Sequence, residues 1–153
     1  GAGLDARAIE LVDWRHKKQI GPLAYVIAGL KALLEKKPQV TVRANGQSAT
    51  GELVLVGNGR FYGGPFAILP QADLRDGVLD ICVLPRVNWR ALFRCAPGLL
   101  LRGKLPAQAV QRLSAATFEL DGESAAFELD GEWVGRLPAT FFVEREKLRV
   151  VVP

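Results

Sequence analysis

The sequence predicts a mainly β fold with flanking helices, an α+β arrangement in which antiparallel strands pack in a sandwich-like way. Two observations carry this prediction. Short runs of apolar, β-branched or aromatic residues follow one another through most of the chain and are separated by turns that contain glycine. Helical spacing is confined to the start of the chain and to one later stretch. Many short strands with glycine-bearing turns favour packed antiparallel sheets.

Helical spacing at the start of the chain predicts two helices. They are expected over Asp5–Trp14 and Leu23–Lys36, and apolar residues of the second recur at steps of three and four, so they share one face. Pro22 suits the first turn of the second helix, because the N–H that proline lacks has no partner there. Pro38 closes this helix.

A third helix is expected over Trp89–Leu101, with Asn88 as its N-cap. Pro97-Gly98 is expected to kink this helix or to end it early. Its apolar residues are expected to pack against the sheet. In the alternative, some of them border an acyl-chain groove or touch a bilayer. The residues concerned are Phe93, Leu99, Leu100 and Leu101, flanked by Arg94, Arg102 and Lys104.

The remaining chain reads as short strands joined by tight turns. Asp-Gly and Asn-Gly pairs favour such turns because glycine accepts a positive φ at little cost. These pairs stand at Asn45-Gly46, Asp76-Gly77, Asp121-Gly122 and Asp130-Gly131. The predicted strands are Val40–Val42, Gly51–Val56, Ala67–Leu69, Val78–Leu84, Ala116–Leu120, Ser124–Leu129, Ala139–Val143 and Leu148–Val152.

Length and composition indicate one globular domain. The 153 residues suffice for a single core, and 49% hydrophobic with 24% charged residues is ordinary for a soluble protein. No apolar run approaches the roughly 20 residues that a membrane-spanning helix needs. Cys82 and Cys95 stand in apolar surroundings without metal-ligand spacing, which predicts buried free thiols and a cytoplasmic location.

The net charge of +4 points to an anionic partner or to an ordinary solvated surface. Basic residues gather at Arg15–Lys18, Lys36-Lys37 and Arg102–Lys104. Such a face would suit peripheral association with an anionic membrane surface that carries a lipid substrate, at about 1 kcal/mol per cation. Nucleic acid is excluded as a partner, because no basic stripe interleaved with aromatic residues occurs.

Three stretches resemble the diacylglycerol kinase family of lipid kinases, which includes bacterial lipid kinases and the sphingosine kinases. They are FELDGEWVGRLP at Phe127–Pro138, VGNGRFYGGPFAILPQADLRDGVLD at Val56–Asp80, and Gly3–Tyr25, which is similar to the family's entry into its second domain. The resemblance implies the C-terminal domain of the NAD kinase/diacylglycerol kinase-like architecture.

The family's GGDGT-type nucleotide loop, which lies in a preceding α/β domain, does not occur in this sequence. We therefore expect residues 1–153 to be a single domain, the lipid-substrate half of a two-domain kinase. ATP and Mg²⁺ would be bound mainly by the absent N-terminal domain, and this chain alone would be nearly inactive. The lipid alcohol would be diacylglycerol or a related long-chain lipid.

Glu132 is the candidate catalytic base, because a lipid kinase needs a carboxylate to take the proton of the lipid hydroxyl. It stands in DGEWVGRLP, similar to the family's DGEP-like motif, in which the glutamate is the proton acceptor. Trp133 replaces the proline of many members, and Glu123 lies in a second DGE triplet. The alternative is a solvated hairpin turn without a catalytic role.

Two further groups are carried over from the resemblance. Asp76 would bind a metal through its side chain, and Asp73 and Val78 through main-chain oxygens; the alternative is a plain type I turn. The glycine-rich bend after an apolar strand would line the cleft between the two domains, or serve conformation alone. Its candidate residues are Asn58, Gly59, Gly63 and Gly64.

Two other functions stay open. One is a non-catalytic, β-rich module that binds a lipid or a protein partner, in which the DGE turns are only turns. The other is a nucleotide kinase domain like that of the NAD kinases. The sequence also leaves a homodimer open.

Overall fold

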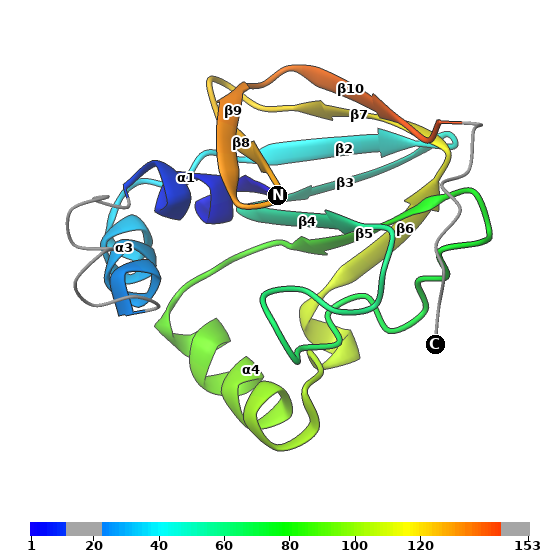
Figure 1. Cartoon of the computed structure of the whole chain (residues 1–153). Coiled ribbons are helices and arrows are strands. Elements are labelled where there is room, and N and C mark those ends of the chain that lie inside the picture. The colour runs from blue at the N-terminus through cyan, green and yellow to red at the C-terminus, as the bar shows by residue number, and fades with distance from the viewer. Residues whose placement is uncertain (12–22, 145–153) are drawn as a thin grey trace.

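The computed structural model describes residues 1–11 and 23–144 of the chain. Its strands form two antiparallel sheets (Figure 1), one with the strand order β6-β5-β4-β1-β8-β9 and one with the order β10-β7-β2-β3. The predicted mainly β class with sandwich-like sheets is confirmed. The strands are β1 (Ala2–Gly3), β2 (Val40–Ala44), β3 (Gln47–Gly51), β4 (Leu53–Gly57), β5 (Leu79–Leu84), β6 (Gln111–Ala115), β7 (Thr117–Asp121), β8 (Ala126–Leu129), β9 (Glu132–Arg136) and β10 (Ala139–Phe142).

Apolar side chains from both sheets pack together in the main core. Val40 and Val42 of β2 meet Val54 of β4 there, and all three side chains are fully buried. Phe118 stacks on Phe141 with 5.3 Å between ring centroids. This core holds the two sheets together and forms one wall of the pocket described below.

A second core covers the opposite face of the six-stranded sheet. Strand β5 contributes to both cores: Ile81 and Val83 point into the first, and Cys82 and Leu84 into the second. This alternation explains why β5 reads as a continuous apolar run, as is typical of a strand buried on both faces. Both cysteines are free and buried, as the sequence predicts.

The helices are α1 (Leu4–Glu10), α3 (Leu23–Leu34), α4 (Trp89–Arg102) and the 3₁₀ turn η1 (Ala107–Ala109). Helices α1 and α3 lie together at one end of the sheets, and α4 lies beyond the second core (Figure 1). The described start of the first predicted helix and the second helix are confirmed. No helix in the described part of the chain is both long and apolar enough to cross a bilayer.

Helix α4 begins as the sequence predicts, but Pro97 does not end it. The Asn88 side chain accepts a hydrogen bond from the Ala91 N–H at 2.9 Å, and the helix runs on to Gly103, whose φ of 62° makes the C-cap. Proline removes only the hydrogen bond to the carbonyl of Phe93. Phe93 and Pro97 are both exposed, so water can reach that carbonyl.

Several strand predictions are wrong in detail. The Ala67–Leu69 segment forms no strand; it belongs to the connection 58–78 between β4 and β5, and its apolar character reflects burial of Ile68 and Leu69 in the second core. The predicted strand Gly51–Val56 is divided, because Gly51 ends β3. Strands β1, β6 and β9, and β3 before Gly51, lack a strong apolar signal and were not predicted. Leu148–Val152 lies outside the described residues.

The sequence FELDGE occurs twice, at Phe118–Glu123 and Phe127–Glu132, which from the sequence alone resembles one hairpin, but the two copies lie in different sheets. Phe118–Asp121 belongs to β7, which pairs with β2 and β10, whereas Phe127–Leu129 belongs to β8, which pairs with β1 and β9. Equal sequences therefore do not form one hairpin, and the two DGE triplets have different surroundings.

Candidate functional site

The second DGE triplet forms a tight hairpin between β8 and β9. Asp130 and Gly131 have φ angles of 51° and 84°, and Leu129 faces Glu132 across the turn. Two consecutive positive φ angles are the conformation of a type I′ hairpin, which Asp-Gly adopts readily. Glu132 therefore stands as the first residue of β9, directly after the turn, with its side chain exposed.

The hairpin is anchored by a carboxylate that the sequence analysis missed. Glu128 is 2% exposed, and its Oε2 accepts the Gly131 N–H at 2.6 Å. The register of β8 against β9 shifts between Phe127 and Glu128, which is typical of a β-bulge. The buried carboxylate thus fixes the turn that carries Glu132.

Glu128 belongs to a cluster with Tyr62 and Asp5. The Tyr62 hydroxyl lies 2.8 Å from Glu128 Oε1 and 2.6 Å from Asp5 Oδ2. The single hydroxyl proton lies within reach of both carboxyl groups, and each of them can accept it. The amino group of Gly1 also contacts the Glu128 carboxylate.

The pKa values of the two carboxyl groups are shifted in opposite directions. Burial raises the pKa of Asp5 against the opposing effect of its bond to Tyr62. Burial also acts to raise the pKa of Glu128, but the Gly1 amino group, Tyr62 and the Gly131 N–H together hold it below its ordinary value. The pKa of Asp5 is thus displaced upward and that of Glu128 downward.

An apolar pocket of about 750 Å³ lies beside this cluster and the hairpin. Asp5, Tyr62 and Glu128 are part of its wall, as are Asp130 and Gly131 of the turn. Its apolar lining comes from α1, β4, the following connection and both sheets. Examples are Leu4, Ile9, Val56, Phe61, Leu120 and Phe141.

The described residues that line this pocket include three carboxylates and no lysine, arginine or histidine. A phosphate group would meet no cationic side chain among these described lining residues. An uncharged, mostly apolar molecule with a hydroxyl group fits better, because the apolar walls can bury its chain and the polar cluster can accept a hydrogen bond.

The predicted glycine-rich bend borders the pocket in part. Asn58 and Gly63 line it, whereas Gly59 and Gly64 lie in the same connection without lining it. Gly63 and Gly64 have φ angles of 64° and 109°, which explains the choice of glycine at both positions.

The predicted metal loop is a pair of turns closed by aspartate side chains. Asp73 Oδ1 accepts the N–H of Arg75, and Asp76 Oδ1 accepts that of Val78, each at 3.0 Å. The described residues contain no cluster of three or more His, Cys, Asp or Glu side chains suited to a metal. One carboxylate and two carbonyls are hard oxygen donors, which fit a largely hydrated Mg²⁺.

Of the predicted catalytic, bend and metal residues, Asn58 and Gly63 line the pocket, whereas Glu132 directly follows Gly131 of its wall without lining it. The loop Asp73–Val78 is joined to it by Leu79, which lines the pocket. One sequence signal could have found Glu128, since it is the one charged residue of the run Ser124–Leu129. No comparable signal marks Asp5 or Tyr62.

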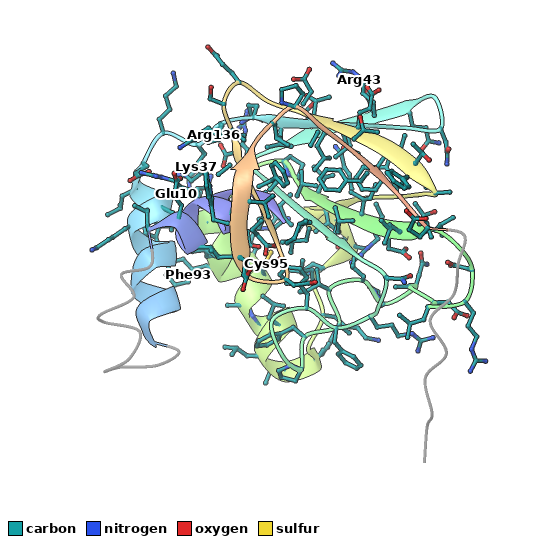
Figure 2. All side chains as sticks on the ribbon, turned by 45° about the horizontal axis from the view of Figure 1, so that its top comes forward. Glu10, Lys37, Arg43, Phe93, Cys95 and Arg136 are labelled. Carbon is teal, nitrogen blue, oxygen red and sulfur yellow. The ribbon has the colours of Figure 1, made fainter. Side chains whose placement is uncertain are left out.

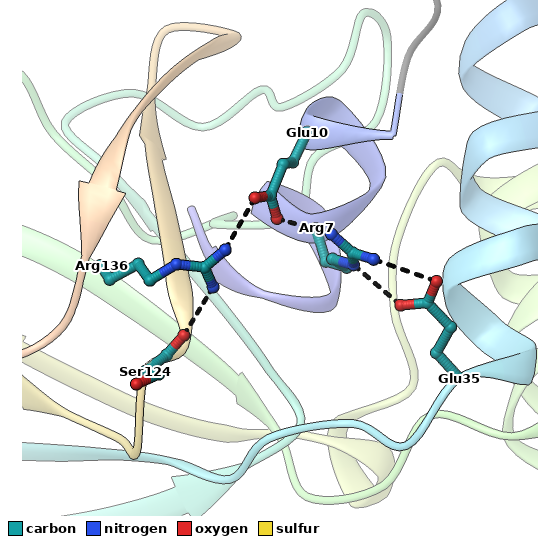
Figure 3. Close-up of polar contacts among 5 residues, drawn as sticks. All are labelled: Arg7, Glu10, Glu35, Ser124 and Arg136. Atoms are coloured by element: carbon teal, nitrogen blue, oxygen red, sulfur yellow. Dashed lines mark hydrogen bonds and ion pairs between the residues drawn. The ribbon is translucent and has the colours of Figure 1, made fainter.

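An ion-pair network ties the helices to the hairpin (Figure 3). Arg7 of α1 donates to both oxygens of Glu35, at 2.8 and 3.1 Å, and to Glu10. Glu10 also accepts from Arg136 at 2.8 Å, and Arg136 donates to the Ser124 carbonyl. The network therefore runs from the end of α3 through α1 to β9, the strand that begins with Glu132.

Two antiparallel sheets, a DGE hairpin and an apolar pocket behind it define a β-sandwich-like domain of the diacylglycerol kinase-like class. The chain belongs to a known family within this class. Residues 1–152 match the family model described as the YegS C-terminal NAD kinase beta sandwich-like domain. The resemblance to lipid kinases noted in the sequence is confirmed.

Curated relatives and solved structures agree with this family. A probable lipid kinase YegS-like of Stenotrophomonas maltophilia is 33% identical over 122 residues, which cover 70% of this chain and 39% of the relative. A protein of the same description from Pseudomonas putida is 32% identical with the same coverage. A diacylglycerol kinase of Bacillus anthracis has a similar fold, with a TM-score of 0.57, 24% identity, and coverage of 84% of this chain and 45% of its own. This chain thus spans about two fifths of the length of these relatives.

Proposed function

We propose that this chain is the lipid-binding half of a kinase that transfers the γ-phosphate of ATP to the hydroxyl group of diacylglycerol or a related long-chain lipid alcohol. The observation that carries the proposal is an apolar pocket next to the hairpin before Glu132. The described residues that line it include no lysine, arginine or histidine. Relatives named as probable lipid kinases support the reaction class.

The pocket would hold the lipid before the reaction and favour its release afterwards. Its apolar walls can cover part of an acyl chain or a glycerol backbone. The product carries a phosphate, which the carboxylates of Glu128 and Asp130 would repel. A nucleotide substrate is disfavoured by the same argument, because its phosphates would find no basic side chain among the described lining residues.

In this proposal Glu132 is the general base that takes the proton of the lipid hydroxyl, and Glu128 is a positioning residue that fixes the hairpin before it. Asn58, Gly59, Gly63 and Gly64 would form the side of the cleft that faces the nucleotide. ATP with Mg²⁺ supplies the phosphoryl group, and most of its contacts would come from a nucleotide-binding domain outside this chain.

The proposal is tested by the ATP-dependent phosphorylation of diacylglycerol in mixed micelles, using the full-length protein in which this chain occurs. Glu132→Gln should lower the rate by about 10²–10⁴-fold, because it removes the proton acceptor but keeps the shape. Glu123→Gln is the matched control, because it changes the other DGE triplet, and it should keep the wild-type rate.

Other outcomes separate the alternatives. An active wild type with an unaffected Glu132→Gln variant would keep the kinase and reject Glu132 as its base. No product with any lipid alcohol would favour the non-catalytic module, and product with a nucleoside substrate alone would favour the NAD kinase-like function. The 153-residue chain by itself should show little turnover.

We further propose that the loop Asp73–Val78 binds Mg²⁺ through the Asp76 carboxylate and the carbonyls of Asp73 and Val78. Mg²⁺ at ten times its dissociation constant should then stabilise the wild-type chain by about 1.4 kcal/mol. Thermal unfolding with and without MgCl₂ measures this directly. Asp76→Ala should abolish the shift, and an equal shift in wild type and variant would reject the site.

A further inference from the structure

Helix α4 exposes an apolar stripe along one face. Trp89, Phe93 and Leu100 follow at steps of four and seven residues, so they share a face, and their side chains are 50%, 75% and 78% exposed. Cys95 is buried, and Leu99 packs against the second core. Figure 2 labels Phe93 and Cys95, which lie two residues apart on this helix and therefore point in different directions.

Basic residues border this stripe without any acid in the same segment. From Ile81 to Phe118 the sequence contains no aspartate or glutamate. Arg90 and Arg94 each follow a residue of the stripe by one position, which places them about 100° further round the helix, on the same side as Leu101. Leu101 is 83% exposed. The basic residues of this segment are Arg86, Arg90, Arg94, Arg102, Lys104 and Arg112.

The end of α4 is joined to the wall of the pocket. The Ala67 N–H donates to the Gly103 carbonyl at 2.6 Å, so the connection after β4 runs beside the end of the helix. The same connection carries Phe61, which lines the pocket and is 66% exposed. The connection between β4 and β5 therefore links the end of α4 to the pocket wall through the chain from Phe61 to Ala67.

We propose that α4 docks on a membrane that contains anionic lipids. Trp89, Phe93 and Leu100 enter the boundary between headgroups and acyl chains, and the neighbouring arginines meet the lipid phosphates. A helix with an apolar face, cations beside it and no acid is suited to lie in this interface. Long arginine side chains can keep their charge among the headgroups while their stems cover apolar surface.

This inference deepens the proposed function, because a kinase that takes its substrate from a bilayer needs such a contact. The physical argument does not depend on catalysis. A membrane is favoured over a protein partner by charge complementarity, since the whole segment from Ile81 to Phe118 is cationic and an anionic bilayer complements it over any part of the helix.

The test is co-sedimentation of the 153-residue chain with vesicles of phosphatidylcholine alone or with roughly 30% phosphatidylglycerol, where each well-placed cation contributes about 1 kcal/mol. Wild type should bind the anionic vesicles and bind them more weakly in high salt. The double substitution Leu100→Ser and Leu101→Ser should lower the partition constant about tenfold. Arg90→Glu with Arg94→Glu should lower it at least as much.

Leu34→Ser is the matched control. Leu34 ends α3 and is 77% exposed, like Leu100, but it lies outside the docking face. Its variant should bind vesicles as the wild type does. Unchanged thermal unfolding in all variants would show that they remain folded.

Equal vesicle binding by wild type and both α4 variants would overturn the inference. So would self-association in the absence of lipid that the leucine substitutions abolish, because the stripe would then be an interface between copies. The kinase proposal fails separately: vesicle binding needs no turnover, and in the full-length protein the α4 variants should keep their rate on a short-chain, water-soluble diacylglycerol.

Discussion

Glu128 illustrates how a single residue organises the site. A buried carboxylate costs several kcal/mol unless it is paired and hydrogen-bonded. Here one oxygen accepts the Gly131 N–H and the other lies within hydrogen-bond distance of Tyr62. The same bonds that make its burial tolerable also fix the turn before Glu132.

Substitutions of Glu128 should therefore lower the free energy of unfolding, and by more when more of its hydrogen bonds are lost. Glu128→Ala leaves the Gly131 N–H and the Tyr62 hydroxyl without this acceptor and should destabilise the chain by about 1–3 kcal/mol in urea unfolding. Glu128→Gln retains an acceptor oxygen and should cost less than about 1 kcal/mol. Equal losses in both variants would mean that side-chain volume, and not hydrogen bonding, is what matters at this position.

Asp5 should make the stability of the chain depend on pH. Folding raises its pKa above the ordinary value of 3.8, mainly through burial, so the stability it contributes is full at low pH and is lost as the pH rises through the folded-state pKa. Asp5→Asn removes this titration. Its free energy of unfolding relative to wild type should therefore increase from pH 4 towards neutral pH.

Urea unfolding of both proteins across this range measures the difference. Glu123→Gln, which removes an exposed carboxylate, is measured beside it as the control for the loss of one negative charge. A flat difference for Asp5→Asn would show that burial does not perturb this carboxyl group.

At the scale of elements, the hairpins could be predicted from sequence better than the strands they join. Asn45-Gly46 and Asp130-Gly131 are both tight turns with two positive φ angles, because the residue types leave few alternatives. Strand β9 was missed, since its residues are half polar and its place at the sheet edge comes from pairing with β8. Ala67–Leu69 shows the opposite error. Its residues are apolar because the connection is buried there, and this apolar run was mistaken for a strand.

These two hairpins offer a matched pair of substitutions. Gly46 and Gly131 have φ angles of 74° and 84°, and an added Cβ would meet nothing within 4 Å at either position. Gly46→Ala and Gly131→Ala should therefore lose a similar stability, about 1–2 kcal/mol, from backbone strain alone. In the full-length protein only Gly131→Ala should lower kinase activity, because only that turn is followed by Glu132. If both substitutions change kinase activity equally, the geometry of the Asp130-Gly131 turn is not important for the reaction.

At the scale of the whole molecule, the fold class and the DGE hairpin were accessible from sequence, whereas the polar cluster was not. Asp5, Tyr62 and Glu128 are separated by more than fifty residues at each step, and only the pairing of β1 with β4 and β8 brings their elements together. The spacing of these three residues along the chain does not indicate that they lie together in the folded protein. The ion-pair network could not be predicted from the sequence either, because Glu10 and Arg136 come together only in the folded chain.

The ion-pair network between α1 and β9 should have its largest effect on local stability at the edge of the six-stranded sheet. Strand β9 is an edge strand, paired on one side with β8, and Arg136 connects it to α1 through Glu10. Because Arg136 is 49% exposed, its ion pair should contribute no more than about 0.2–1 kcal/mol to global stability, less in high salt. The effect on local opening should be easier to see, since an edge strand opens before the core does.

Arg136→Ala should therefore accelerate amide hydrogen exchange in β8 and β9 while leaving β2 and β3 unchanged. Arg43→Ala is the matched control, because it removes a similarly exposed ion pair, with Asp121, from the other sheet. If Arg136→Ala leaves the exchange of β9 at the wild-type rate, the hairpin is held by Glu128 and its strand pairing alone. Faster exchange confined to β8 and β9 would instead show that the contact with α1 helps to hold the strand that presents Glu132.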